Sequence, residues 1–234
     1  MRIDILTLFP EMMEAVLSES IIGRARKSGK VTINCVNIRD FTRDKHRRVD
    51  DYPYGGGRGM LMQAEPIYEA YKSVCAEGET PPLIYMSPQG QTLTQDTAHE
   101  LSGLSHIVVL CGHYEGVDER ALMITHAREI SIGDYVLTGG ELPALVLCDA
   151  VCRLLPGVLK DDESFLKESH QGGLLEYPQY TRPEEYMGMR VPDVLLSGHH
   201  ENVEKWRREQ SLERTRDKRP DLYEKYMGDR KDAK

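Results

Sequence analysis

Apolar and polar residues alternate at the start of the chain, in residues 1–8 and again in residues 31–38. A period of two residues is the pattern of a half-buried β-strand, so both segments are predicted to be strands. Between them, residues 10–26 carry apolar side chains at four-residue steps and begin with a proline, as helices often do. A strand, a helix and a second strand in this order indicate an α/β protein.

Two short segments farther along, residues 83–86 and 107–111, are almost entirely apolar. Strands of this kind are buried on both faces and are typical of a parallel sheet. Each segment ends where polar residues and glycines begin, and ligands of open α/β sheets usually bind at these carboxyl ends. Helices are predicted at about 65–75 and at 142–155, where a Pro-Gly pair ends the second one.

The segment from Ser131 to Ala144 predicts a binding loop. A β-rich run with an early glycine reaches Gly139 and Gly140, and a helix opens at once with Pro143 in its first turn. Glycines permit close backbone approach, and the first amides of a helix are free to bind a small polar ligand. An ordinary strand–turn–helix junction fits the spacing at least as well, so other segments must decide between the two interpretations.

Composition and charge narrow the class of protein. The 234 residues, 40% hydrophobic and 29% charged, suit a soluble globular protein of one or two domains. The net charge of −8 argues against nonspecific binding of nucleic acid by the whole surface. Two basic islands, within residues 43–48 and 201–234, fit recognition of one RNA better. For any single residue, a solvated charge is the simpler interpretation. The first island consists of Arg43, Lys45, Arg47 and Arg48.

Other classes are disfavoured. The N-terminus lacks a basic segment followed by an apolar one, and no apolar run approaches the roughly 20 residues of a membrane span, so a cytoplasmic protein is expected. Five cysteines at unrelated spacings predict reduced core thiols rather than a disulfide scaffold or a zinc site. His199 and His200 have no second ligand cluster in the sequence, so no metal site is predicted.

Several long blocks of sequence carry a resemblance to a known family. They are residues 8–12 (Leu-Phe-Pro-Glu-Met), 46–60, 110–120 (Leu-Cys-Gly-His-Tyr-Glu-Gly-Val-Asp-Glu-Arg), 131–144 and 205–207 (Lys-Trp-Arg). Together they make the chain similar, nearly from end to end, to the bacterial tRNA (guanine-37-N1)-methyltransferases. This family belongs to the SPOUT class of S-adenosylmethionine-dependent methyltransferases. The resemblance implies an α/β fold whose parallel-sheet domain contains a deep trefoil knot, although periodicity shows no knot and base rates oppose one.

The same resemblance implies a division of the chain. Residues 1–159 would form the knotted catalytic domain that binds S-adenosylmethionine, residues 160–172 a flexible linker, and residues 173–234 a small, mainly helical domain that grips the anticodon stem-loop of tRNA. The family acts as a homodimer in which one subunit's cofactor loops meet the other's linker and C-terminal domain. Magnesium as an aid to catalysis is also implied, although no carboxylate cluster identifies a site.

Three loops are expected to meet at the sheet edge and hold the methyl donor. No G-x-G-x-x-G follows a strand, so the residues alone indicate a small-molecule loop site, and the identity of the donor rests on the resemblance. The residues assigned to cofactor binding are Tyr85, Met86, Ser87, Pro88, Gly112, Tyr114, Glu115, Ser131, Ile132, Gly133, Tyr135, Leu137, Gly139, Gly140 and Pro143.

Methylation of guanine at N1 requires removal of the N1 proton, for which a carboxylate near N1 and a cation near O6 would serve. Arg153 matches the family's catalytic arginine, although an ion pair with Asp149 one helical turn earlier would also explain it. The family's aspartate, in an Asp-Ser-Phe triplet, falls on Glu168 in an ungapped count. A histidine replaces the phenylalanine there, and Glu163 of Glu-Ser-Phe is the rival base.

The segment of residues 46–60 holds four glycines in five positions, which lets backbone pack against a flat base or a phosphate. It lacks the lysine and Ser/Thr of a P-loop. Arg58 stands where the family more often has proline or a small residue, and an RNA contact and a solvent-facing side chain are equally good interpretations. The residues assigned to substrate binding are Arg47, Asp50, Tyr54, Gly55, Gly56, Gly57, Gly59, His199, Lys205, Arg207 and Arg208.

The expected function is therefore transfer of a methyl group from S-adenosylmethionine to N1 of the guanosine 3′ to the tRNA anticodon. One alternative is another knotted RNA methyltransferase that acts on ribose or on another base. A second is a noncatalytic RNA-binding protein that keeps the donor pocket as a structural or sensing site. The acidic residue of the linker and Arg153 argue against the second, because binding alone requires neither.

Overall fold

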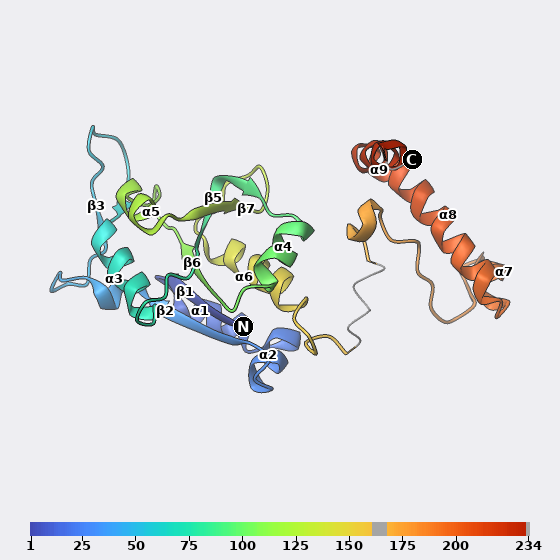
Figure 1. Ribbon diagram of the computed structural model, residues 1–234, viewed down its shortest axis with the longest axis horizontal. Helices are drawn as coiled ribbons and strands as arrows, with labels where there is room; N and C mark the ends of the chain where they lie inside the picture. The colour runs from blue at the N-terminus through green and yellow to red at the C-terminus, as the bar shows by residue number, and fades with distance from the viewer. Residues whose placement is uncertain (161–167, 233–234) are drawn as a thin grey trace. The chain divides into compact units, whose positions relative to one another are not determined.

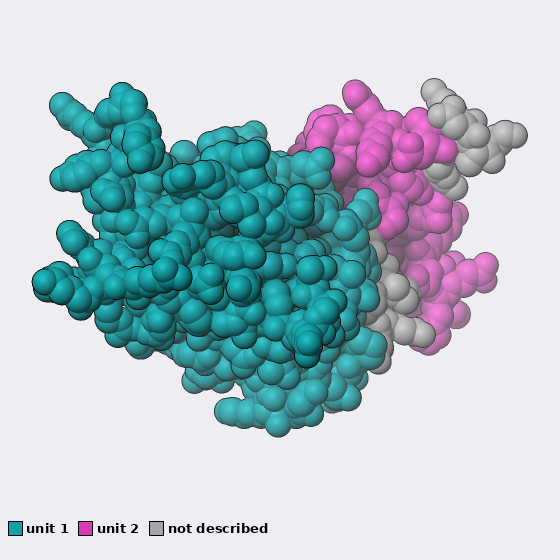
Figure 2. Space-filling view, turned by 60° about the vertical axis from the view of Figure 1, so that its left-hand side comes forward, with its two compact units in different colours: residues 1–162 teal, residues 163–234 magenta. Residues whose placement is uncertain are grey.

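The structure is a computed structural model that describes residues 1–160 and 168–232. The chain divides into two compact units, residues 1–162 and residues 163–234, coloured teal and magenta in Figure 2. Each unit has its own secondary structure and is described by itself below.

A five-stranded parallel sheet forms the centre of the first unit, with the strand order β2-β1-β6-β5-β7. The alternating and all-apolar segments of the sequence become strands as predicted. Ile3 in β1, for example, pairs with Ile33 in β2 on one side and with Ile107 in β6 on the other. The strands are β1 (Arg2–Thr7), β2 (Thr32–Asn37), β5 (Leu83–Thr92), β6 (His106–Cys111) and β7 (Arg128–Ser131).

Helices cover both faces of this sheet (Figure 1). Helices α3 (Ala64–Val74) and α5 (Glu119–Thr125) pack on one face, where Leu6 and Leu110 belong to the same buried cluster as Ile67 of α3. Helices α1 (Pro10–Leu17), α4 (Gln95–Ser102) and α6 (Glu141–Cys152) pack together on the opposite face. The result is a three-layer α/β arrangement, so the predicted α/β class with a parallel sheet is confirmed.

Three details of the prediction are wrong. The helix predicted over residues 10–26 is two helices, α1 and α2 (Ser20–Lys27), because Ser20 has a φ of 53° and interrupts the first. The strand expected from Ser131 onward lies upstream as β7, and residues 132–140 form a loop. Helices α4 and α5 lie where no helix was predicted.

All five cysteines are free, and Cys111, Cys148 and Cys152 are buried. Burial raises the pKa of the Cys111 and Cys148 thiols well above its usual value and raises that of Cys152 to about 12. These three thiols therefore stay protonated and pack as small apolar groups, whereas Cys35 and Cys75 are only half-buried.

The second unit consists mainly of helices. Helix α8 packs against α7 and α9, and Thr215 of α8 accepts a hydrogen bond from the Leu175 N–H at 2.9 Å. None of the helices in the described residues of either unit is long and apolar enough to cross a membrane. The elements are η3 (Gln171–Gly173), β8 (Glu185–Tyr186), β9 (Met189–Arg190), α7 (Asp193–Leu196), α8 (His200–Lys218) and α9 (Pro220–Asp232).

Candidate functional site

A cavity of about 230 Å³ opens where β6 and β7 end, next to an interruption within β5. Its walls are three loops, one inside β5 and one after each of the other two strands, and the three strands are neighbours in the sheet. Because the strands run parallel, these loops lie at the same edge of the sheet, and this places residues distant in sequence around one small volume. A cavity of this size suits a small molecule rather than a polymer.

The first loop is an excursion inside β5. Met86 and Gln91 both pair with Ile130 of β7, so the residues between them leave the ladder and reach the cavity. A Cβ at Gly90 would overlap backbone atoms of Glu129 and Ile130, so only glycine lets the chain return against β7. Ser87, Pro88 and Gln89 line the cavity as a result.

The second loop follows β6 from Gly112 to Gly116. The Tyr85 ring lies directly behind it, because a Cβ at Gly112 would come within 2.9 Å of the Tyr85 Oη. Burial raises the pKa of Tyr85 to about 12, so its hydroxyl stays protonated and can donate a hydrogen bond at the cavity wall. Tyr114 follows with a φ of 59°, a left-handed backbone conformation that few residues other than glycine adopt.

The third loop connects β7 to α6 and is fastened to the second. The Gly140 N–H donates to the Gly112 carbonyl at 2.8 Å, and a Cβ at Gly140 would come within 2.7 Å of the Cys111 Cα. At the other end of this loop, the Ser131 hydroxyl donates to the Gly133 carbonyl at 2.9 Å. Backbone contact between the two loops thus requires the glycine that the sequence places before the helix.

A buried acid lies at the start of α6, close to the third loop. The Thr7 Oγ1 donates to Glu141 Oε1 at 2.8 Å, and Glu141 is only 4% exposed. A Cβ at Gly139 would meet Glu141 Oε2 at 2.5 Å and His113 Nδ1 at 2.9 Å, so both side chains flank the same backbone position. His113 Nδ1 is buried and has no hydrogen-bond partner in the described part of the chain.

The described residues that line the cavity include the carboxylates Glu115, Glu119 and Glu129, and none of them is a lysine or an arginine. Such a wall favours a ligand with positive charge, and its apolar and backbone groups suit a flat ring. These features fit S-adenosylmethionine, whose sulfonium is positive and whose adenine is flat. The unpartnered His113 Nδ1 and the tight glycine contacts are further features of a built cavity rather than of an ordinary junction.

Every residue assigned to cofactor binding from the sequence lies on this cavity. Several neighbours of these residues were not assigned, although including every residue of each loop would have found them. Residues of α5 were also missed, because that helix was not predicted. The omitted lining residues are Gln89, His113, Gly116, Val117, Glu119, Leu122, Glu129, Ile130, Val136 and Thr138.

The two residues assigned to catalysis lie in different units. Arg153 is the C-terminal cap of α6 and is half-buried. Glu168 precedes η3 in the second unit and is also half-buried. The rival base Glu163 lies outside the described residues.

The glycine-rich segment assigned to the substrate is a loop closed by a small ribbon. Strands β3 (Asp50–Asp51) and β4 (Leu61–Met62) pair antiparallel at its base, so Asp50 lies in a strand rather than in the loop. Tyr54 at the tip is 98% exposed, and Gly55, Gly56, Gly57 and Gly59 all have positive φ. An exposed aromatic ring beside bare backbone is suited to stacking against a base.

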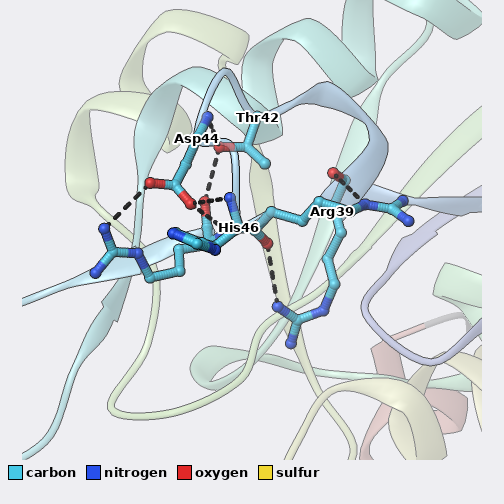
Figure 3. A network of polar contacts seen from close by, with 6 residues as sticks. Arg39, Thr42, Asp44 and His46 are labelled. Carbon is cyan, nitrogen blue, oxygen red and sulfur yellow. Dashed lines mark hydrogen bonds and ion pairs between the residues drawn. The ribbon is translucent and has the colours of Figure 1, made fainter.

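Residues 42–48, called the basic loop below, precede this ribbon and are ordered by their own polar contacts (Figure 3). Asp44 Oδ1 accepts from the His46 N–H at 2.8 Å, and Asp44 Oδ2 accepts from Arg48 Nη2 at 3.1 Å. The Arg48 hydrogen bond holds the pKa of Asp44 below its usual value. The Thr42 hydroxyl donates to the Arg48 carbonyl at 2.7 Å and closes the loop.

The four residues assigned to the substrate in the second unit lie along α8 or at its N-terminus. Lys205 and Arg208 are exposed, and His199 is the N-terminal cap. Arg207, by contrast, packs with its guanidinium carbon 4.8 Å from the centre of the Tyr177 ring and donates to an acidic neighbour in α8. Lys205 and Arg208 are therefore better placed than Arg207 to meet a phosphate.

Within residues 1–160 and 168–232, no group of three or more His, Cys, Asp or Glu side chains is arranged to hold a metal ion.

Comparison with known proteins shows that nearly the whole chain matches one protein family. Residues 1–225 match the family described as tRNA (Guanine-1)-methyltransferase TrmD. A protein of Ruminiclostridium cellulolyticum named tRNA (guanine-N(1)-)-methyltransferase is 62% identical over 227 residues, which cover 96% of this chain and 97% of that protein. A protein of the same name from Moorella thermoacetica is 58% identical over 224 residues, covering 95% of this chain and 90% of its own.

Proposed function

The chain belongs to the tRNA (guanine-1)-methyltransferase family, and from this premise we propose that it methylates N1 of guanosine 37 in tRNA with S-adenosylmethionine as the donor. The observation that carries the proposal is the cavity formed by the excursion in β5 and the loops that follow β6 and β7. Its carboxylates suit a small, positively charged ligand, and its close backbone contacts and the Tyr85 hydroxyl donor suit the polar groups of such a ligand.

The three loops would hold the cofactor with backbone groups and ring walls. Ser87 and the Gly112–Gly116 loop would border it, and the loop from Ser131 to Gly140 would close over it. Bound there, S-adenosylmethionine supplies an activated methyl group. We propose that these loops form the trefoil knot of the SPOUT class, as membership of the family implies.

The acceptor nitrogen requires a base, since N1 of guanine carries a proton at neutral pH. We propose that Glu168 accepts this proton and that Arg153 stabilises the negative charge that develops at O6. Both residues are half-buried, where a charge acts more strongly than in open water. A bound tRNA would place its guanine between Glu168 and Arg153.

The tRNA would be bound by surfaces of both units. In the first unit, the exposed Tyr54 lies at the tip of the glycine-rich loop, and the exposed Arg47 lies in the basic loop that precedes it. In the second unit, Lys205 and Arg208 are exposed on α8. We propose that residues 1–159 act as the catalytic domain, residues 160–172 as the linker, and residues 173–234 as the part that binds the anticodon stem-loop.

We propose that the chain acts as a homodimer through the exposed apolar side chains of α1 and α6. Met12 and Val16 are 45% and 50% exposed on α1, and Leu142 and Val146 are 50% and 47% exposed on α6, which packs against α1. Apolar stripes on two neighbouring helices mark an interaction surface. Such a dimer could bring the linker of one subunit to the cavity of the other.

We propose a cytoplasmic location, because tRNA is used there. We also propose, from the family resemblance alone, that magnesium aids catalysis.

The direct test is to incubate the protein with methyl-labelled S-adenosylmethionine and unmodified tRNA that carries G at positions 36 and 37. Digestion should yield labelled 1-methylguanosine, and a tRNA changed at position 37 should yield none. Label in a ribose or in another base would instead assign the chain to a different RNA methyltransferase reaction. Cofactor binding without any label would leave an RNA-binding protein with a sensing pocket.

The variant Glu168→Gln tests the base. It should lower the single-turnover rate by about a hundredfold or more, the range of general-base catalysis, because the amide cannot take the proton. The Kd for S-adenosylmethionine should stay within about twofold, since the loss is confined to a proton-accepting step. Glu163→Gln is the matched control in the same part of the chain. If Glu163→Gln alone lost the rate, the base would be Glu163.

A further inference from the structure

A single arginine joins the basic loop to the cavity wall. Arg39 belongs to the short helix η1 (Ile38–Phe41), which is fixed by an Asn37 side chain that accepts from the Arg39 N–H at 3.0 Å. Its Nη1 donates to the Arg47 carbonyl at 3.4 Å, and its Nη2 donates to the Tyr114 hydroxyl at 3.4 Å. The second bond spans 75 residues of sequence and reaches the second loop of the cavity.

On the side of the basic loop, Arg39 and Arg47 hold each other reciprocally. Arg47 Nε donates to the Arg39 carbonyl at 3.4 Å, and Arg47 forms an ion pair with Asp40 of the same short helix. Figure 3 shows Arg39 beside the polar contacts of Thr42, Asp44 and His46 that order this loop. A phosphate that binds Arg47 competes with Asp40 for its guanidinium. Movement of Arg47 would shift its own carbonyl, which accepts the hydrogen bond from Arg39.

On the side of the cavity, Tyr114 is a residue whose position depends on its neighbours. Its positive φ of 59° costs conformational energy and persists only where surrounding contacts maintain it. Its ring packs edge-on against His113, with ring centres 4.9 Å apart, and His113 packs in turn against Phe9 at 5.1 Å. The bond from Arg39 fixes the opposite end of the same ring, its hydroxyl.

Backbone contacts reinforce this connection from the glycine-rich ribbon. The Glu115 N–H donates to the Met60 carbonyl at 3.0 Å, and the Met62 N–H donates to the Gly116 carbonyl at 2.9 Å. The second loop of the cavity is therefore joined to the two segments that we propose bind tRNA. The backbone hydrogen bonds do not depend on the identity of the side chains, whereas the Arg39 contacts can be removed by one substitution.

We propose that Arg39 is a positioning residue that couples tRNA binding at the basic loop to the shape of the cofactor cavity through Tyr114. The inference rests on the proposed function, because it takes the cavity to bind S-adenosylmethionine and the basic loop to bind tRNA. The coupling requires the forked guanidinium, whose two terminal nitrogens reach two acceptors in different directions. A lysine keeps the positive charge but cannot make both bonds from one fixed plane.

The test compares Kd values for S-adenosylhomocysteine, measured by calorimetry with and without saturating unmodified tRNA. In the wild type, tRNA should tighten binding at least about fivefold, within the usual range of coupling between two sites. In Arg39→Lys and in Tyr114→Phe this gain should fall below about twofold. The double variant should lose no more than the larger single loss, because both changes break the same connection.

Arg43→Lys is the matched control. Arg43 belongs to the same basic loop but pairs with Glu65 of α3 at 3.0 Å, so its variant should keep the wild-type gain. Measured without cofactor, the tRNA Kd of Arg39→Lys should remain close to that of Arg43→Lys, which separates coupling from simple loss of an RNA contact. Thermal melting of each variant checks that the fold is kept.

Three results would overturn the inference. One is a wild-type protein whose affinity for S-adenosylhomocysteine does not depend on tRNA. Another is an Arg39→Lys variant that keeps the wild-type gain. The last is a double variant in which the losses of the two single variants add. Failure of the proposed function has a different signature, since the protein would then form no 1-methylguanosine whatever the binding data show.

Discussion

At the scale of single residues, the buried contact between Thr7 and Glu141 ties the end of β1 to the start of α6. The Thr7 Oγ1 donates to the carboxylate at 2.8 Å and also accepts from the Phe9 N–H at 2.9 Å. A carboxylate that is 4% exposed has lost nearly all its water, so its protein partner matters more than that of a surface acid.

Thr7→Val should therefore lower the free energy of unfolding by about 1–3 kcal/mol, because it leaves the Glu141 oxygen and the Phe9 N–H without this partner while keeping the side-chain shape. Urea denaturation measures the change. Thr7→Ser keeps the hydroxyl and is the control, with less than half of the loss expected. Equal losses in both variants would show that the methyl group, and not the hydrogen bond, is what matters there.

At the scale of elements, the strands and the long helices could be predicted because each has its own local pattern. The all-apolar residues 107–111 become β6, and the apolar residues 142–155 become α6, shortened to end at Cys152. The break between α1 and α2 could not be predicted, since the apolar spacing continues across it and only the φ of Ser20 records the interruption. The loop after residue 86 was expected, but the return of β5 to Ile130 of β7 at Gln91 was not, because pairing over such a distance leaves no local pattern.

The same contrast holds for the candidate site. The glycines of the third loop could be identified, because a Gly-Gly pair before a helix is a recognisable local pattern. The hydrogen bond from Arg39 to Tyr114 could not, since an arginine after a strand has many possible partners. Local patterns locate loops, whereas the contacts between loops arise only when the sheet brings their ends together.

The helices α1 and α6 carry a prediction of their own. Val146→Asp should convert the proposed dimer to a monomer, because it would bury an unpaired charge at the interface. Sedimentation or light scattering measures the molar mass. Met123→Asp is the control, since Met123 is 65% exposed on α5, away from these helices, and should leave the mass unchanged. A monomeric wild type, or a dimeric Val146→Asp, would contradict this assignment of the interface.

At the scale of the whole molecule, the two residues that we propose for catalysis belong to different compact units, Arg153 to the first and Glu168 to the second. A site that needs both can be completed within one subunit or between two. In a dimer whose sites combine the cavity of one subunit with the linker of its partner, each site takes Arg153 from one chain and Glu168 from the other.

Mixed dimers distinguish the two arrangements. Arg153→Ala and Glu168→Gln should each be nearly inactive alone, but a heterodimer of the two contains one site with both native residues if the sites are shared. Random reassortment of equal amounts makes half of the dimers mixed, so about a quarter of the wild-type rate should return. If both residues act within one subunit, every site in the mixture lacks one of them and no rate returns. Recovery in this experiment would explain why the proposed base, Glu168, lies outside the unit that contains the cavity, since Arg153 would be supplied to it by the other chain.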